Sequence, residues 1–168
     1  MASRIKKVAV IGAGTMGSGI AAHVANAGLP CVLLDIVPPN LSDEERKVKA
    51  NRDRFAAGAM QAAIKAKKPP NLPFHTTRFA GLVTTGNLED DLELLSDCDL
   101  IVEAIVENLK IKRDLFQKIA KVRKPGAIVA SNTSGIAIAS LMDGFEEEFR
   151  AHFLVTHFFN PPRFMRLL

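Results

Sequence analysis

Three glycines near the N-terminus have a spacing suited to holding a phosphate group. Gly12, Gly14 and Gly17 form a G-x-G-x-x-G pattern that follows an apolar run, 6–11, and leads into an Ala-rich stretch, 16–27. In this pattern the first glycine allows a tight turn, the second lets a pyrophosphate approach the backbone, and the third lets helix and strand pack closely. The alternative is a glycine turn that serves packing alone.

An acidic residue closes the next apolar run. Asp35 follows the run 31–34 and lies 18 residues after the last glycine of the pattern, where a carboxylate can accept hydrogen bonds from the ribose hydroxyls of a dinucleotide. Its negative charge would repel a 2′-phosphate, so the pattern favours NAD over NADP. The residues predicted to bind this half of the cofactor are Gly12, Gly14, Thr15, Met16, Gly17 and Asp35.

A second group of polar residues lies where later strands should end. Hydride transfer from an alcohol needs a base for the hydroxyl proton and a donor for the developing carbonyl. In doubly wound sheets such groups lie at the carboxyl ends of strands, and the stretches 103–107, 131–135 and 157–160 qualify. His157 is the candidate base, although a single histidine on an apolar strand is commonly a hydrogen-bonded core residue. Ser134 lies in a Ser/Asn/Thr turn, whose alternative role is to cap a helix.

Glu107 and Lys112 lie five residues apart at a strand-to-helix junction. They could reach the ribose or nicotinamide end of a cofactor, but a solvated ion pair has the same spacing.

Two absences narrow the chemistry. The chain contains no G-x-S-x-G motif, so the Ser/His pair does not indicate a hydrolase. It also contains no Tyr, which excludes a reductase that uses a Tyr/Lys acid–base pair. The other histidines, which we expect to be structural or exposed, are His23, His75 and His152.

The elements that position these residues alternate between strand and helix. We expect strands at 6–11, 31–34, 82–85, 100–103, 127–131 and 153–158, and helices at 16–27, 42–67, 89–95, 108–122 and 136–142. Strands that are apolar on both faces, with no hairpin signal between them, predict a doubly wound, Rossmann-type parallel α/β sheet. The last residues, 163–168, are expected to form another strand or core segment.

The stretch 42–75 is predicted to be a helical insertion after the second strand. Ser42 and Glu45 have the spacing of a capping box, and a helix from there should reach Lys67 before the proline-containing stretch 69–73 ends it. About 25 residues make a helix roughly 37 Å long. That is too long for an ordinary crossover, so we expect it to protrude.

Charge and composition restrict the partners. The net charge of the 168-residue chain is +4, and the segment 43–68, with eight basic and four acidic residues, carries all of it. One basic segment suits a local anionic group better than nucleic acid. Apolar runs of about five to seven residues are too short to span a membrane. Cys31 and Cys98 lie far apart and outside any C-x-x-C motif, so we expect no disulfide framework or metal site, and a reducing cytoplasm is the simplest location.

Four segments together resemble the NAD-binding domain of the 3-hydroxyacyl-CoA dehydrogenase family: VAVIGAGTMGSGIA (8–21), DLIVEAIVENLKIKRDLF (99–116), ASNTSG (130–135) and THFFNPPRFMRLL (156–168). They are spread over almost the whole chain, so one NAD-binding domain over 1–168 is predicted. The stretch 66–87 is most similar to the multifunctional bacterial fatty-acid oxidation proteins. The resemblance implies oxidation of the 3-hydroxyl of an acyl-CoA by NAD, in fatty acid β-oxidation.

The resemblance also implies roles for individual residues. His157 matches the family's catalytic base, and Ser134 matches the serine that hydrogen-bonds the substrate oxygen. Asp35 matches the ligand of the adenosine ribose. The positions around the nicotinamide half of NAD are matched by Glu107, Lys112, Ser134 and Asn160. The basic residues Lys65, Lys67 and Lys68 become candidates for binding the CoA phosphates, with a solvated helix face as the alternative.

One feature of the family falls outside the chain. A glutamate twelve residues after the histidine pairs with it in the family, and counting from His157 leads to position 169, beyond Leu168. The family's helical C-terminal domain, which makes most dimer contacts, would also follow. We therefore expect the 168 residues to bind NAD and turn over poorly, and the full-length protein to be a homo-oligomer. The alternatives are another NAD-dependent hydroxyacid or sugar dehydrogenase and a nucleotide-sensing domain without chemistry.

Overall fold

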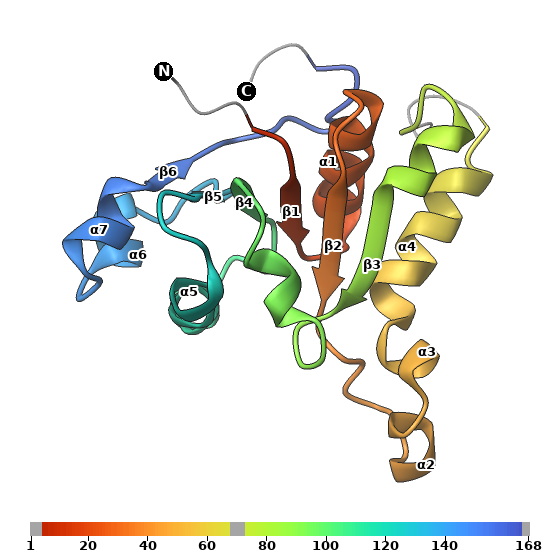
Figure 1. Ribbon diagram of the computed structural model, residues 1–168, viewed down its shortest axis with the longest axis horizontal. Coiled ribbons are helices and arrows are strands. Elements are labelled where there is room, and N and C mark those ends of the chain that lie inside the picture. Colours follow the sequence, from red (N-terminus) through yellow and green to blue (C-terminus); the bar gives the residue numbers. More distant parts are fainter. Residues whose placement is uncertain (1–4, 68–72, 166–168) are drawn as a thin grey trace.

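A six-stranded parallel sheet forms the centre of the computed structural model, which describes residues 5–67 and 73–165 (Figure 1). The strands are β1 (Val8–Ile11), β2 (Cys31–Asp35), β3 (Val83–Asn87), β4 (Leu100–Glu103), β5 (Ile128–Ser131) and β6 (Phe153–Val155). Their order is β3-β2-β1-β4-β5-β6, and every neighbouring pair is parallel. The strand order reverses between β1 and β4, which confirms the predicted doubly wound fold.

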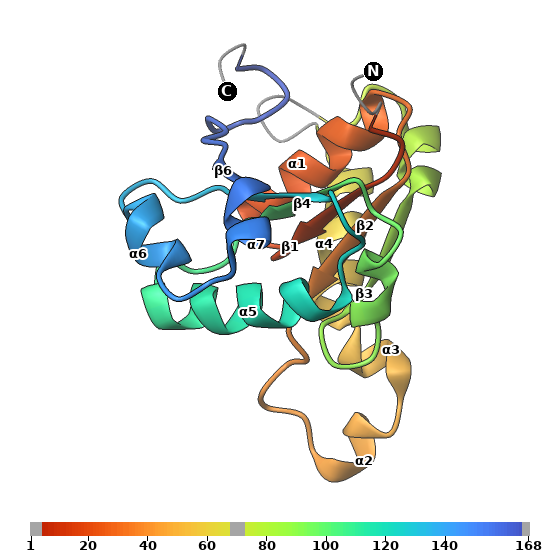
Figure 2. The ribbon, with the colours of Figure 1, turned by 60° about the vertical axis from the view of Figure 1, so that its left-hand side comes forward.

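Helices cover both faces of this sheet. They are α1 (Thr15–Asn26), α2 (Asp43–Arg46), α3 (Lys49–Arg52), α4 (Arg54–Lys65), α5 (Leu109–Val122), α6 (Ile138–Met142) and α7 (Glu147–Ala151), with 3-10 turns η1 (Thr77–Leu82) and η2 (Leu92–Leu95). Figure 2 shows α5 on one side of the sheet and α1 on the other. None of the helices in the described part of the chain combines the length and apolar character needed to cross a bilayer.

The central strand β1 is buried on both faces because each face packs against a separate core. Ala9 and Ile11 belong to the core under α5, α6 and α7, whereas Val8 and Val10 belong to the core under α1 and α4. A strand covered on both sides reads as a continuous apolar run. The prediction of a parallel sheet from strands that are apolar on both faces is therefore confirmed at β1.

The single long helix predicted over 42–67 is wrong in the described residues, and the helical insertion is not confirmed. The capping box at Ser42 and Glu45 forms as expected, but α2 lasts only one turn and Val48 adopts an extended conformation. The chain begins a helix again at α3 and then at α4. Helix α4 lies on the sheet, burying Ala56 and Met60, so it is the ordinary crossover between β2 and β3. Only α2 and α3 lie beyond the sheet edge, at the bottom of Figure 1.

Tertiary ion pairs explain the break. The guanidinium of Arg52 contacts Asp90 at 2.7 Å and Glu89 at 3.0 Å, and the ammonium of Lys49 contacts Asp91 at 2.7 Å. The acidic residues follow β3, so these contacts tie α3 to the loop after that strand. They are invisible to a pattern of helix propensity and capping, which extends the helix through Val48.

The C-terminal part differs from expectation in three smaller ways. Strand β6 ends at Val155 rather than at residue 158, and helix α7 was not anticipated. Residues 163–165, expected in a strand or core segment, form a turn with Phe164 and Met165 exposed. Lys68 and residues 166–168 lie outside the described residues.

The glycine turn after β1 is closely packed at two of its three glycines. Gly12 has φ +100°, and a Cβ there would lie 2.5 Å from the carbonyl oxygen of Ala104. A Cβ on Gly17 would lie 1.7 Å from the carbonyl oxygen of Gly12. At Gly14, by contrast, no heavy atom of the described residues other than its neighbours along the chain lies within 4 Å of the Cβ position. Gly12 and Gly17 are therefore required by packing, and Gly14 leaves open space.

We expect Gly17→Ala to destabilise the fold by at least about 1–3 kcal/mol, because the backbone must move to admit the methyl group. Helix propensity alone predicts the opposite, a gain of about 1 kcal/mol. Urea unfolding measures the difference. The matched control is Gly14→Ala, whose added methyl group meets open space and should cost less than about 1 kcal/mol. Equal stability of the two variants would contradict this account.

Candidate functional site

The polar stretches predicted from the sequence meet at one edge of the sheet. The glycine turn follows β1, the stretch 103–107 includes the end of β4, the stretch 131–135 begins at the end of β5, and 157–160 lies just after β6. Because all six strands are parallel, their carboxyl ends share that edge. Hydrogen bonds then join the stretches, as described below.

Asp35 lies against the glycine turn. Its Oδ2 accepts a hydrogen bond from the backbone N–H of Ala13 at 2.7 Å, and its Oδ1 accepts one from Ile36 N–H at 2.6 Å. The turn is also held by the N–H of Gly12, which donates to Leu34 O at 2.8 Å. Helix α1 begins directly after Gly14, so the amides of its first turn, which have no partner within the helix, face the same edge.

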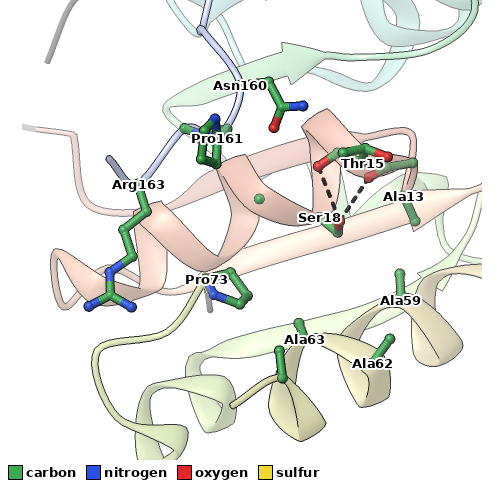
Figure 3. Close-up of a pocket in the computed structure, with 14 residues that line it drawn as sticks. Ala13, Thr15, Ser18, Ala59, Ala62, Ala63, Pro73, Asn160, Pro161 and Arg163 are labelled. Atoms are coloured by element: carbon green, nitrogen blue, oxygen red, sulfur yellow. Dashed lines mark hydrogen bonds between the residues drawn. The ribbon is translucent and has the colours of Figure 1, made fainter. Parts of the chain in front are cut away.

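A pocket of about 470 Å³ adjoins this turn (Figure 3). One wall is the start of α1, from Gly14 to Gly19, the opposite wall is α4, and the turn 160–163 closes the third side. The α4 wall consists of small side chains: Ala59, Ala62, Ala63 and Ala66. Gly19 is in contact with the turn, since a Cβ there would lie 3.1 Å from Cδ of Pro162. The pocket is therefore lined mainly by small apolar residues, with the N-terminus of α1 at one end.

The candidate base and the candidate serine are neighbours. Oγ of Ser134 lies 3.3 Å from Nε2 of His157, although the two residues belong to different loops. The imidazole is exposed and stacks on the ring of Phe159, with centroids 5.2 Å apart and an angle of 7° between the planes. At the next residue, the N–H of Phe158 donates a hydrogen bond to Oδ1 of Asn132 at 2.8 Å. His157 is thus presented at the surface of the site rather than buried in the core.

Ser134 does not take its alternative role as a helix cap, because the N-cap of α6 is Ala137, which makes no side-chain capping bond. The hydroxyl of Thr133 accepts the N–H of Ile136 at 3.2 Å, while Ser134 points its hydroxyl toward His157. Thr133 is 4% exposed and was not among the predicted site residues. A threonine one position before the predicted serine was the available signal.

Glu107 holds the turn that contains the serine. Its Oε1 accepts the N–H groups of Ser134 and Gly135, both at 3.1 Å, and the hydroxyl of Thr133. Partial burial raises the pKa of this carboxyl, but the hydrogen bonds from Thr133, Gly135, Lys112 and Ser134 outweigh it and lower the pKa to about 2. Glu107 is therefore an ionised acceptor at neutral pH.

Lys112 is buried, at 1% side-chain exposure, and forms ion pairs with two carboxylates. Its Nζ lies 2.6 Å from Oε1 of Glu103, which is 0% exposed, and 3.2 Å from Oε2 of Glu107. The pair is therefore not the solvated one that the spacing allowed. Glu103, at the end of β4, lies in the predicted stretch 103–107 but was not among the predicted site residues, because nothing in the sequence places it against Lys112.

Other predicted residues lie at the margins of the site. Asn160 lines the pocket near the start of α1. Lys65 and Lys67 are exposed at the end of α4, next to the pocket residue Ala66. Of the remaining histidines, His75 bonds Arg163 at 2.9 Å and His152 bonds the carbonyl of Glu148 at 2.8 Å, whereas burial lowers the pKa of His23.

We expect Lys112→Met to cost about 3–5 kcal/mol of stability, since it leaves the carboxylate of Glu103 buried without its counter-charge. The double variant Glu103→Gln, Lys112→Met removes both charges and should recover part of the loss. Thermal or urea unfolding of the two proteins measures the difference. A double variant less stable than Lys112→Met would argue against a charge-based cost.

Comparisons with known proteins agree with this geometry. The family model for the NAD binding domain of 3-hydroxyacyl-CoA dehydrogenase matches residues 7–168. A probable 3-hydroxyacyl-CoA dehydrogenase of Bacillus subtilis is 47% identical over 174 residues, covering 100% of this chain and 22% of the relative. A putative fatty acid oxidation complex trifunctional enzyme of Rickettsia felis is 45% identical over 168 residues, with the same coverage.

Among solved structures, 3-hydroxybutyryl-CoA dehydrogenase from Escherichia coli K12 superposes with a TM-score of 0.72 at 28% identity, covering 98% of this chain and 32% of that one. The chain thus spans less than a third of each of these three proteins. The match extends over nearly every residue of this chain, through the glycine turn, Glu107 and His157 alike. The chain belongs to the family of 3-hydroxyacyl-CoA dehydrogenase NAD-binding domains.

Proposed function

We propose that this chain is the cofactor-binding and proton-transferring part of an enzyme that oxidises the 3-hydroxyl of a 3-hydroxyacyl-CoA to a 3-ketoacyl-CoA with NAD. The observation that carries the proposal is the 3.3 Å approach of Ser134 Oγ to His157 Nε2 at the carboxyl edge of the sheet. A base and a hydroxyl donor meet there beside a glycine turn, as alcohol oxidation requires.

The residues of the turn fit a dinucleotide. The open space at Gly14 gives a pyrophosphate room to approach the backbone, and the first amides of α1 offer donors with positive potential. Each oxygen of Asp35 already accepts one backbone N–H, and an ionised carboxylate has lone pairs left for two ribose hydroxyls. Gly12, Thr15, Met16 and Gly17 complete the proposed adenosine-side contacts. Glu107, Lys112, Ser134 and Asn160 are the proposed nicotinamide-side positions, with Lys112 acting through Glu107 because its own side chain is buried.

When bound, NAD supplies the acceptor for the hydride. The chain's own residues handle the proton and the oxygen. Nε2 of His157 takes the proton of the substrate hydroxyl, and Oγ of Ser134 hydrogen-bonds the substrate oxygen as it becomes a carbonyl. Phe159 holds the plane of the imidazole by stacking on it. Glu107 holds the serine through the two backbone N–H groups of the turn.

The acyl-CoA is the proposed substrate because of the family and the basic helix end. Exposed Lys65 and Lys67 lie beside Ala66 of the pocket, where they could meet phosphate groups, whereas a solvated helix face remains the alternative. A relative that is named a trifunctional enzyme supports the proposal that the domain operates within a longer protein. We propose further that this longer protein is a homo-oligomer in the cytoplasm. Its partners are small molecules rather than nucleic acid or membrane.

We expect the 168-residue chain to bind NADH much more tightly than NADPH, because Asp35 repels a 2′-phosphate. Titrations that follow the fluorescence of NADH and of NADPH measure the two affinities directly, since the chain contains no Trp. Gly14→Ala should weaken NADH binding about tenfold or more while leaving stability nearly unchanged, because its methyl group occupies the space for the pyrophosphate. Free CoA added as a competitor tests whether Lys65 and Lys67 bind the CoA phosphates. Equal affinities for NADH and NADPH would reject the role of Asp35.

We expect little or no reduction of acetoacetyl-CoA by NADH with the 168 residues alone. In a longer chain that carries the family's glutamate, His157→Gln should lower kcat by at least about 100-fold, because general-base catalysis contributes about 10²–10⁴-fold, while NADH affinity changes little. A nucleotide-sensing domain would be indifferent to this substitution. Another hydroxyacid dehydrogenase would show no preference for CoA esters. Retained turnover in His157→Gln would refute the assignment of the base.

A further inference from the structure

The carboxylate of Glu103 accepts three hydrogen bonds at a position with no solvent exposure. Its Oε1 accepts from Lys112 Nζ at 2.6 Å and from the backbone N–H of Ile105 at 2.8 Å. Its Oε2 accepts from Oγ of Ser131 at 2.5 Å. Burying a charge is costly unless it is paired and hydrogen-bonded. The three contacts join Glu103 to helix α5 at Lys112, to the loop after β4 at Ile105, and to the end of β5 at Ser131.

The ammonium of Lys112 lies between two unequal carboxylates. Glu103 on one side is fully buried, whereas Glu107 on the other is 44% exposed. The shorter and more buried contact, to Glu103, sets where the ammonium sits. The longer contact then presents the ammonium to Glu107, whose other oxygen binds the turn 133–135.

We propose that Glu103 is a positioning residue for Ser134, acting through Lys112 and Glu107. The route consists of contacts that run from Glu103 to Lys112, from Lys112 to Glu107, and from Glu107 to the N–H of Ser134, whose hydroxyl meets His157. This inference rests on the proposed function for the importance of Ser134, but the positioning itself does not depend on any ligand.

The negative charge of Glu103 is needed, beyond its shape. Without that charge the ammonium of Lys112 stays desolvated with only one counter-charge, so it moves toward Glu107 and water. The carboxylate of Glu107 keeps its contact with the displaced ammonium and moves with it. It then gives up the hydrogen bonds from the N–H groups of Ser134 and Gly135. A second route is also present, since Glu103 contacts Ser131 in the strand that leads into the same turn. The test must therefore separate the two routes.

The experiment measures backbone ¹⁵N order parameters of the 168-residue chain without any ligand. In Glu103→Gln we expect the order parameters of Ser134 and Gly135 to fall from about 0.85 to below about 0.6, the range of a flexible loop. The amide of Val129 in β5, which donates to His152 O at 2.9 Å, should stay rigid. Unchanged values at Ser134 and Gly135 would overturn the proposal.

A double-mutant comparison identifies the route. In Glu107→Gln the turn has already lost its charged acceptor, so adding Glu103→Gln should change the order parameters of the turn no further. If Glu103→Gln lowers them by the same amount in both backgrounds, the effect passes through Ser131 and the proposed route is wrong. Glu107 is 44% exposed and Lys112 keeps its contact with Glu103, so Glu107→Gln by itself leaves no buried charge without a partner and should not prevent folding.

The matched control for general destabilisation is Ile119→Val. Ile119 is fully buried two turns along α5 from Lys112, and its truncation loosens the same helix without touching an ion pair. The turn should keep its order in this variant. A loss of order equal to that in Glu103→Gln would show that any weakening of α5 has this effect, which would overturn the proposal.

A kinetic measurement connects the turn to the proposed reaction. In a longer chain that carries the family's glutamate, Glu103→Gln should lower kcat about tenfold while KM for NADH changes much less, because the serine meets the substrate oxygen and the adenosine-side contacts of the glycine turn are untouched. An unchanged kcat would overturn the role of the positioning. Failure of NADH to bind the wild-type chain would instead reject the proposed function and leave the order-parameter result standing.

Discussion

Helix α1 can begin at the sheet edge only because residue 17 has no side chain. Any Cβ there would lie 1.7 Å from the carbonyl oxygen of Gly12, so the helix would have to move away from β1. The close approach aims the free amides of the first helical turn at the edge where the strands end. It also places α1 against α4 and the turn 160–163, which together form the pocket. The cofactor half of the site therefore depends on this steric constraint.

The other half depends on electrostatics in a dry environment. Lys112 and Glu103 are both buried, and a charge there is tolerable only with a partner at hydrogen-bonding distance. Their pairing connects the end of β4 to the first turns of α5. Glu107 extends the connection to the turn after β5, and its own charge is kept by the donors around it. The loop of Ser134 is thus fixed by charge, whereas the loop of His157 is held by the hydrogen bond from Phe158 N–H to Asn132 and by the packing of Phe158 against the core under α1 and α4.

The region between β2 and β3 shows how tertiary contacts override local preference. The capping box at Ser42 and Glu45 and the proline-containing stretch 69–73 predict one helix from Ser42 to Lys67. The chain instead breaks at Val48, since Lys49 and Arg52 gain carboxylate partners on the loop after β3. Asp91 lies 42 residues after Lys49, and Asp90 lies 38 residues after Arg52. A local pattern has no access to them.

The sequence by itself determined the parallel sheet, the place of the glycine turn, the carboxylate that closes β2, and the loops that carry Ser134 and His157. These follow from local signals: apolar runs buried on both faces, glycine spacing, and polar residues directly after strands. Tertiary structure alone decided that the hydroxyl of Thr133, rather than that of Ser134, accepts the N–H of Ile136. It also decided that Lys112 is buried and that Glu103 forms an ion pair with it. The physical reason is that hydrogen bonds and ion pairs between loops depend on distances in space, which the fold sets and which spacing along the chain does not encode.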